Sequence, residues 1–137
     1  MLDHISLTVK DVEASARFYM GLFGLKTDKG WERKPEGLRA MVLLSDNTTR
    51  LELIQAKDMK PNLNNRNRNN FVDVTKQEGF THISFSVKNM DGTVAKAVEM
   101  GGRIIEKPRT GITVKSFAFV EDPDGIAIEL VERDRSK

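Results

Sequence analysis

The 137-residue sequence contains no cysteine, which excludes disulfides, a thiolate nucleophile and metal sites built on sulfur. No apolar run approaches the roughly 20 residues of a membrane-spanning helix, and Asp3 and His4 interrupt any start resembling a signal peptide. The net charge is only +2 and the basic residues are scattered, so charge gives no case for nucleic-acid binding. We therefore expect a globular, cytoplasmic protein that binds neither membrane nor nucleic acid.

Histidine is also scarce, and its two copies lie at equivalent places in an internal repeat. Residues 4–13 match residues 82–91 at a distance of 78 residues, with five identities. A second phrase, residues 50–54, matches residues 127–131 at a distance of 77 residues. Each copy thus pairs one histidine with one late glutamate, which predicts a duplicated fold with a site shared between the copies. The pairs are His4 with Glu52 and His82 with Glu129.

Each copy has the hydrophobic pattern of a strand, a helix and three further strands. Residues 2–9 and 80–88 alternate between polar and apolar, as a strand with one covered face does. Asp11 and Asn89 are suited to cap the helices that follow, and glycines are suited to end them. We expect helix ends at about Phe23 and Gly101-Gly102, further strands at about 25–33, 38–45, 49–55, 103–107, 114–121 and 126–132, and turns at Asp46-Asn47 and Asp122-Pro123-Asp124-Gly125.

This pattern predicts a single α+β domain over residues 1–137, made of two tandem modules. The first module would span about 1–56 and the second about 80–134. Residues 57–79 between them form an irregular, Asn-rich stretch with Arg66, Arg68 and Phe71. A loop of that length in a compact domain is usually a linker or a functional lid. We expect either a solvated linker or a flap whose arginines or phenylalanine contact a ligand.

The two His/Glu pairs are the candidate metal ligands. Each of the four residues lies near or on a predicted strand and points away from the apolar set of that strand. Burying a carboxylate alone costs several kcal/mol, so each glutamate should be exposed or paired with a cation. Two such pairs facing one cavity would supply only nitrogen and oxygen ligands, with a charge of −2. This set suits one divalent ion, such as Zn, Ni, Co, Mn or Fe.

Several phrases in chain order, together with this constellation, resemble the vicinal oxygen chelate superfamily. The superfamily includes glyoxalase I, methylmalonyl-CoA epimerase, extradiol dioxygenases, and the fosfomycin and bleomycin resistance proteins. The resemblance covers nearly the whole chain outside residues 56–79. The phrases are Asp3-His4-Ile5, Arg17-Phe18-Tyr19, Leu22-Phe23-Gly24-Leu25, Gly79-Phe80-Thr81-His82-Ile83, Ala118-Phe119-Val120-Glu121-Asp122-Pro123-Asp124-Gly125 and Ile128-Glu129-Leu130.

The resemblance implies paired βαβββ modules, each with a sheet curled around a metal cavity. It also implies a homodimer, in which modules of two chains are exchanged in some members. The set His4, Glu52, His82 and Glu129 is most similar to that of glyoxalase I (lactoylglutathione lyase). Epimerases usually have glutamine at the position of Glu52. Extradiol dioxygenases and fosfomycin-type transferases use two histidines and one carboxylate, and bleomycin-binding members generally lack the set.

By this resemblance, the small-molecule substrate would chelate the metal through two adjacent oxygens, as a 2-oxoaldehyde hemithioacetal can. The metal would act as a Lewis acid while a proton moves between neighbouring carbons. Glu129 is implied as the base that takes the proton, and Glu52 as the group that could return it on the other face.

The identity of the thiol cosubstrate is open. Lys115 matches a lysine that can bind a carboxylate of glutathione in glyoxalase I, and an ordinary exposed lysine is the alternative. Three other glutathione-binding positions of that family differ here, where the chain has Thr8, Ala56 and Glu78. Another metalloenzyme of this superfamily and a non-catalytic drug- or metabolite-binding protein therefore remain as alternatives.

Overall fold

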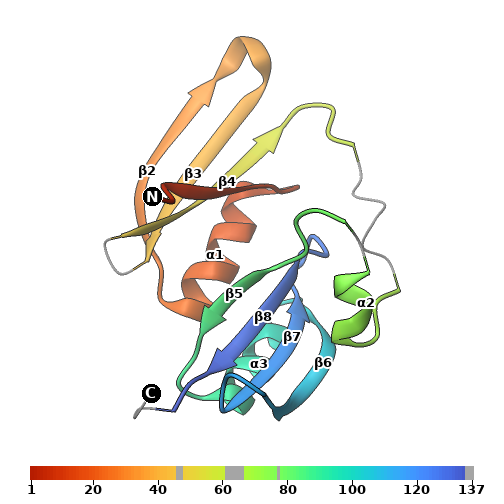
Figure 1. Ribbon diagram of the computed structural model, residues 1–137. Coiled ribbons are helices and arrows are strands. Elements are labelled where there is room, and N and C mark those ends of the chain that lie inside the picture. Colours follow the sequence, from red (N-terminus) through yellow and green to blue (C-terminus); the bar gives the residue numbers. More distant parts are fainter. Residues whose placement is uncertain (46–47, 61–66, 77, 135–137) are drawn as a thin grey trace. The chain divides into compact units, whose positions relative to one another are not determined.

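The computed structural model of the chain describes residues 1–45, 48–60, 67–76 and 78–134. The chain forms two compact units, Met1–Pro61 and Asn62–Lys137. Each unit contains one open, four-stranded mixed sheet (Figure 1). The predicted α+β class, with two modules of the same element order, is confirmed. In the described part of the chain, no helix combines the length and apolarity needed to cross a membrane.

The first sheet has the strand order β1-β4-β3-β2. Its outer strand β1 runs parallel to β4, and the other neighbours are antiparallel. The predicted strand ranges are confirmed to within one or two residues at each end. The strands are β1 (His4–Thr8), β2 (Lys26–Arg33), β3 (Leu38–Ser45) and β4 (Thr49–Ala56), with a short 3-10 helix η1 (Lys34–Glu36) between β2 and β3.

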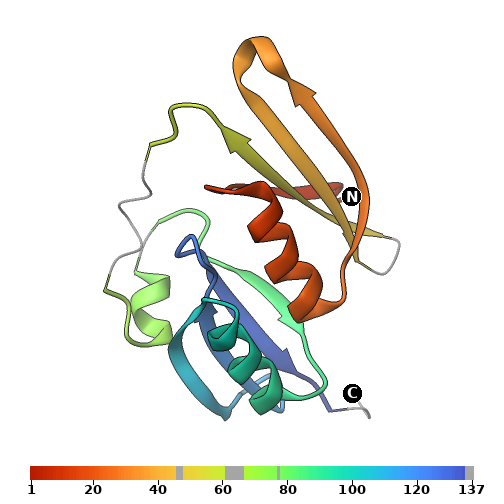
Figure 2. The same ribbon diagram turned by 180° about the vertical axis from the view of Figure 1, so that it is seen from behind.

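Helix α1 (Val12–Phe23) covers one face of this sheet, and Figure 2 shows it lying along the strands. The Asp11 carboxylate caps its first turn by accepting hydrogen bonds from two backbone N–H groups, each at 3.0 Å. Gly24 ends the helix in the left-handed conformation, with φ of 68°. The buried side of α1 therefore packs against the apolar side chains of β3 and β4, and the opposite face of the sheet carries His4 and Glu52.

The second unit repeats this topology, with the strand order β5-β8-β7-β6 and β5 parallel to β8. Its helix α3 (Met90–Glu99) is capped by Asn89, and Gly101 follows with φ of 97°, as predicted. The strands are β5 (Ile83–Ser86), β6 (Arg103–Thr110), β7 (Ser116–Glu121) and β8 (Ala127–Glu132). The strand predicted over 80–88 is thus shorter than expected and begins after His82. The turn before β8 is confirmed, because Asp122 Oδ1 accepts from two backbone N–H groups, each at 2.9 Å.

The stretch between the modules, expected to be irregular, contains one helix and two buried side chains in its described second half, while most of the other residues described there are exposed. Residues Phe71–Thr75 form a short helix, α2, capped by the Asn70 side chain. Val74 is 2% exposed and Phe71 packs against the same cluster as Ile105 and Phe119 of the second sheet. Arg68 is also buried. Arg66, residues 61–65 and the turn expected at Asp46-Asn47 lie outside the described residues.

Candidate metal-binding site

His4 and Glu52 lie on adjacent parallel strands of the first unit. His4 begins β1, and the register of β1 with β4 places Glu52 opposite Ser6, two residues further along. The two side chains share the face that does not pack against α1, and His4 Nε2 lies 3.8 Å from Glu52 Oε1. The Glu52 side chain is only 17% exposed. The predicted first pair is therefore brought together.

The other ring nitrogen of His4 is engaged by the adjacent residue. Its Nδ1 lies 2.7 Å from the Asp3 carboxylate, and this hydrogen bond raises the pKa of His4 above its ordinary value of 6.5. The same hydrogen bond lowers the pKa of Asp3. A carboxylate on one ring nitrogen orients the imidazole and increases the basicity of the other nitrogen. Nε2 of His4 is thus directed toward Glu52.

The second unit contains the corresponding pair. His82 Nε2 lies 3.3 Å from Glu129 Oε2, and each side chain is 25% exposed. The hydroxyl of Thr81 lies 2.8 Å from His82 Nδ1. The ring of Phe119 packs edge-on against His82, with centroids 5.0 Å apart, and Phe71 of α2 stacks on Phe119 at 6.4 Å. The segment preceding the second module thus supports the imidazole through one intervening ring.

Two side chains donate hydrogen bonds to the Glu52 carboxylate, and neither was predicted from the sequence to do so. Ser6 Oγ donates to Glu52 Oε1 at 3.0 Å, and the Trp31 indole N–H donates to Oε2 at 2.9 Å. Ser6 was identifiable from its place in the repeated phrase. Trp31 gives no such signal, because its approach to Glu52 depends on the pairing of β2 with β3 and β4.

The donor set fits a divalent metal ion. Each imidazole directs Nε2 toward a carboxylate and keeps Nδ1 on a polar neighbour, which is the arrangement found in metal-binding histidines. The described residues include no single group of three or more His, Asp or Glu side chains able to hold a metal. Within each unit, one His/Glu pair is brought together. That all four residues bind one ion remains a prediction.

Lys115, the predicted substrate contact, lies directly before β7 rather than within it. Its Nζ lies 2.7 Å from Glu132 Oε1 of the neighbouring strand β8. This pairing raises the pKa of Lys115 and lowers that of Glu132. The lysine is more than half exposed, so its ammonium group is accessible to an anionic ligand.

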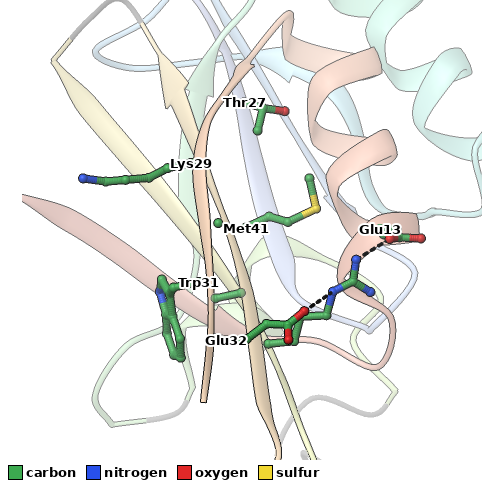
Figure 3. A pocket seen from close by; sticks show the side chains of 9 residues that line it. Glu13, Thr27, Lys29, Trp31, Glu32 and Met41 are labelled. Carbon is green, nitrogen blue, oxygen red and sulfur yellow. Dashed lines mark hydrogen bonds and ion pairs between the residues drawn. The ribbon is translucent and has the colours of Figure 1, made fainter. Parts of the chain in front are cut away.

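A separate pocket of about 490 Å³ lies along β2 and β3 of the first unit (Figure 3). Figure 3 shows Lys29 and Trp31 on one side of β2 and Glu32 on the other. The Arg39 guanidinium is bonded to Glu13 and lies 4.0 Å from Glu32. Neither His4 nor Glu52 lines this pocket, but Trp31, which donates to Glu52, does. It is lined by Glu13, Thr27, Lys29, Gly30, Trp31, Glu32, Arg39, Ala40 and Met41.

Two modules of the same βαβββ order, each with a His/Glu pair on its sheet, define a glyoxalase-like fold. Residues 1–130 match the Glyoxalase/Bleomycin resistance protein/Dioxygenase superfamily, and the chain belongs to this superfamily. The resemblance inferred from the sequence is therefore confirmed. Its members generally use a divalent metal, and the superfamily also includes members that are not glyoxalases.

Several individual proteins are similar to the chain at modest identity. A probable lactoylglutathione lyase of Synechocystis sp. is 40% identical over 62 residues, covering 43% of this chain and 46% of the relative. The lactoylglutathione lyase of Schizosaccharomyces pombe is 27% identical, covering 99% of this chain and 48% of the relative. The chain thus spans about half the length of either relative. Glyoxalase I from Leishmania major, described as trypanothione-dependent, is 24% identical to this chain in sequence. Its structure matches this one with a TM-score of 0.72, and the match covers 96% of this chain and 86% of that chain.

Proposed function

We propose that this protein is a divalent-metal-dependent lyase or isomerase of the glyoxalase I type. Its substrate would be a small molecule with two adjacent oxygens, such as the hemithioacetal of a 2-oxoaldehyde. The observation that carries this proposal is the occurrence of one His/Glu pair at equivalent positions in both modules. The similarity to two lactoylglutathione lyases supports the reaction class.

In this proposal, His4, Glu52, His82 and Glu129 hold one divalent ion. The ion, when bound, supplies Lewis-acid stabilisation of the charge that develops on the substrate oxygens. Glutamate rather than glutamine at position 52 favours the glyoxalase I type over the epimerases. The Asp3 carboxylate holds Nδ1 of His4 and so orients the imidazole with Nε2 as the nitrogen left to bind the metal.

Proton transfer falls to the two carboxylates, whose surroundings differ. Both oxygens of Glu52 accept hydrogen bonds, from Ser6 and Trp31. Among the described residues, the Glu129 carboxylate has one hydrogen-bond partner, His82, at 3.3 Å. We therefore assign Glu129 as the general base that takes the proton from the carbon next to the carbonyl. Glu52 is the candidate for returning a proton on the other face of the substrate.

Lys115 is proposed as a contact for a carboxylate of the thiol cosubstrate. Its ammonium is exposed and paired with a single carboxylate, Glu132, which an anionic ligand can replace as a partner. The family also makes a homodimer the expected assembly, in which the two His/Glu pairs of one site come from one chain or from two.

The proposal is tested by metal analysis followed by a panel of substrates. Wild type and Glu52→Gln are purified, loaded with Ni²⁺ or Zn²⁺, and assayed on methylglyoxal hemithioacetals of glutathione and several other thiols. We expect about one bound ion per site and turnover of at least one adduct by wild type, with both reduced in Glu52→Gln. Light scattering gives the subunit number in the same samples.

The outcomes also distinguish the alternatives. Metal-loaded wild type that turns over none of the adducts would rule out the glyoxalase I assignment. Oxygen uptake with catechols would indicate a dioxygenase, and solvent exchange of an acyl thioester α-proton would indicate an epimerase. Absence of bound metal after loading would favour a non-catalytic binding protein.

A further inference from the structure

The single tryptophan of the chain donates a hydrogen bond to one of the proposed metal ligands. Trp31, which is half-buried on β2, donates from its indole N–H to Glu52 Oε2 at 2.9 Å. Ser6 donates to the other oxygen, Oε1, at 3.0 Å. A hydrogen bond to an ionised carboxylate is shorter and stronger than one between neutral groups. The two donors therefore hold both oxygens of one carboxylate in place.

Strand pairing brings the indole to Glu52. In β3, Val42 lies beside Glu52 of β4, and Ala40, two residues before it, lies beside Trp31 of β2. Residues paired in neighbouring strands share one face of a sheet, so the indole lies on the face that carries Glu52. The small side chain of Ala40 leaves room for the indole to extend across β3.

The second module has no equivalent of this contact. The position that corresponds to Trp31 is Arg109, which pairs with Phe117 as Trp31 pairs with Ala40. The Arg109 guanidinium lies 5.7 Å and 5.9 Å from the ring centres of Phe71 and Phe117, and it bonds to Glu106 at 3.1 Å. Within the ranges that the structure describes, no indole or hydroxyl group donates to Glu129. The two modules thus differ in the hydrogen bonds that their equivalent glutamates, Glu52 and Glu129, accept.

We propose that Trp31 is a positioning residue for Glu52 and hence for the metal. By engaging Oε2, the indole leaves Oε1, the oxygen that faces His4, as the atom that binds the ion. Ser6 steadies Oε1 from the side of β1. This inference rests on the proposed function, since it requires Glu52 to be a metal ligand. It adds a residue of the first module that acts on the metal only through Glu52.

The test removes the N–H group and keeps the ring. Because Trp31 is the single tryptophan, growth on β-(3-benzothienyl)alanine replaces this residue alone with a ring of the same shape that has no N–H group. Trp31→Phe is made in parallel. Isothermal titration with Ni²⁺ and Zn²⁺ then measures affinity, independently of activity. Losing a group that orients a metal ligand typically weakens binding 10- to 100-fold, and we expect about that loss in both variants.

Two further variants separate the positioning role from general effects on folding. Ser6→Ala removes the second donor and should also weaken metal binding. Ser84→Ala is the matched control, because Ser84 pairs with Glu129 as Ser6 pairs with Glu52 and is exposed. It should leave the affinity unchanged. In wild type, paramagnetic Ni²⁺ should quench the emission of Trp31 in proportion to occupancy, and Glu52→Gln should reduce this quenching at the same Ni²⁺ concentration.

The outcomes distinguish this inference from the proposed function. If wild type binds metal and the benzothienyl variant binds it with the same affinity, the positioning role is wrong and the proposed function stands. If wild type binds neither ion, the proposed function fails, and the positioning role fails with it. Should Trp31→Phe fail to fold, the benzothienyl variant alone decides, because it preserves the packing of the ring.

Discussion

The guanidinium of Arg68 lies 3.1 Å from the Glu121 carboxylate, and both residues are buried. Arg68 also donates to the carbonyl oxygen of Gly125 at 2.7 Å. Arg103 binds the same carboxylate through two hydrogen bonds, at 2.8 Å and 3.1 Å. These contacts join the chain that precedes α2 to β6, β7 and the turn before β8.

Arg68→Met should destabilise the protein. Removing one partner of a buried pair costs about 3–5 kcal/mol because the other charge is left uncompensated. Here Arg103 still neutralises Glu121, so we expect the free energy of unfolding to fall by about 2 kcal/mol. Urea denaturation followed by circular dichroism measures this change.

The control for this variant is Arg33→Met. Arg33 pairs with Glu36 at 2.8 Å, but the two side chains are 64% and 47% exposed. An exposed pair of this kind contributes about 0–1 kcal/mol, so the control should unfold almost as wild type does. Equal losses of unfolding free energy in the two variants would show that the buried Arg68 pair contributes no more stability than an exposed ion pair.

The Asn-rich stretch before the second module is where sequence reasoning was least successful. Its helix α2 has five residues, too few for a helical period to stand out from noise. The burial of Arg68 and Phe71 depends on partners about 35 to 57 positions later in the chain. Composition alone made the stretch resemble a solvated linker. The described part of the stretch is held in place by tertiary packing, and a local sequence pattern does not indicate such packing.

Phe71→Ala tests this packing. The Phe71 ring contacts the rings of Phe117 and Phe119, with centroids 5.5 Å and 6.4 Å away. Truncating a core phenylalanine costs about 3–5 kcal/mol, and we expect the lower end, about 3 kcal/mol, because Phe71 is partly buried. The measurement is again the free energy of unfolding in urea.

Val72→Ala provides the comparison within the same helix. Val72 is 45% exposed, so its truncation should change the stability by less than about 0.5 kcal/mol. If Phe71→Ala were as stable as Val72→Ala, α2 would not be part of the folded core.

Elsewhere the sequence was a reliable guide, for physical reasons. Alternation in β1 and the caps Asp11 and Asn89 are local features, and the structure confirms all of them. The His/Glu pairs within each module were found because duplication repeats both members. Trp31 was not found, because it belongs to one module only and reaches Glu52 across a strand. The sequence repeat therefore predicted the features that both modules share, such as the His/Glu pairs. It did not predict a contact that only one module has, such as that of Trp31 with Glu52.

Metal binding should stabilise the protein in a way that depends on the four proposed ligands. At a free Ni²⁺ concentration 100 times the dissociation constant, the gain is about 2.7 kcal/mol. A 100-fold loss of affinity leaves only about 0.4 kcal/mol at the same concentration. We expect such a loss in Glu52→Gln and in Glu129→Gln, and urea denaturation with Ni²⁺ or with a chelator measures it.

Glu132→Gln is the matched control, since Glu132 lies on the same strand as Glu129 but is bonded to Lys115. It should keep the full stabilisation by metal. A Glu129→Gln protein stabilised by Ni²⁺ as strongly as this control would show that Glu129 is not a ligand.

The pair of Glu132 and Lys115 should also give a defined pH dependence of stability. The hydrogen bond that Lys115 donates to Glu132 lowers the pKa of Glu132 below its ordinary value of 4.5 and raises the pKa of Lys115 above 10.5. A lowered carboxyl pKa stabilises the folded state above pH 4.5, and this contribution is lost as pH falls through the lowered value. A raised lysine pKa stabilises below pH 10.5, and this contribution is lost as pH rises through the raised value.

The difference in unfolding free energy between wild type and Glu132→Gln should therefore be constant between pH 4.5 and 10.5 and should shrink on either side. Both groups are exposed, so the plateau should be small and should decrease when salt is added. Denaturation curves at matched pH values in low and high salt measure it. A difference that persisted unchanged well below pH 4.5 would mean that the two side chains do not interact through charge, because protonated Glu132 can no longer form an ion pair.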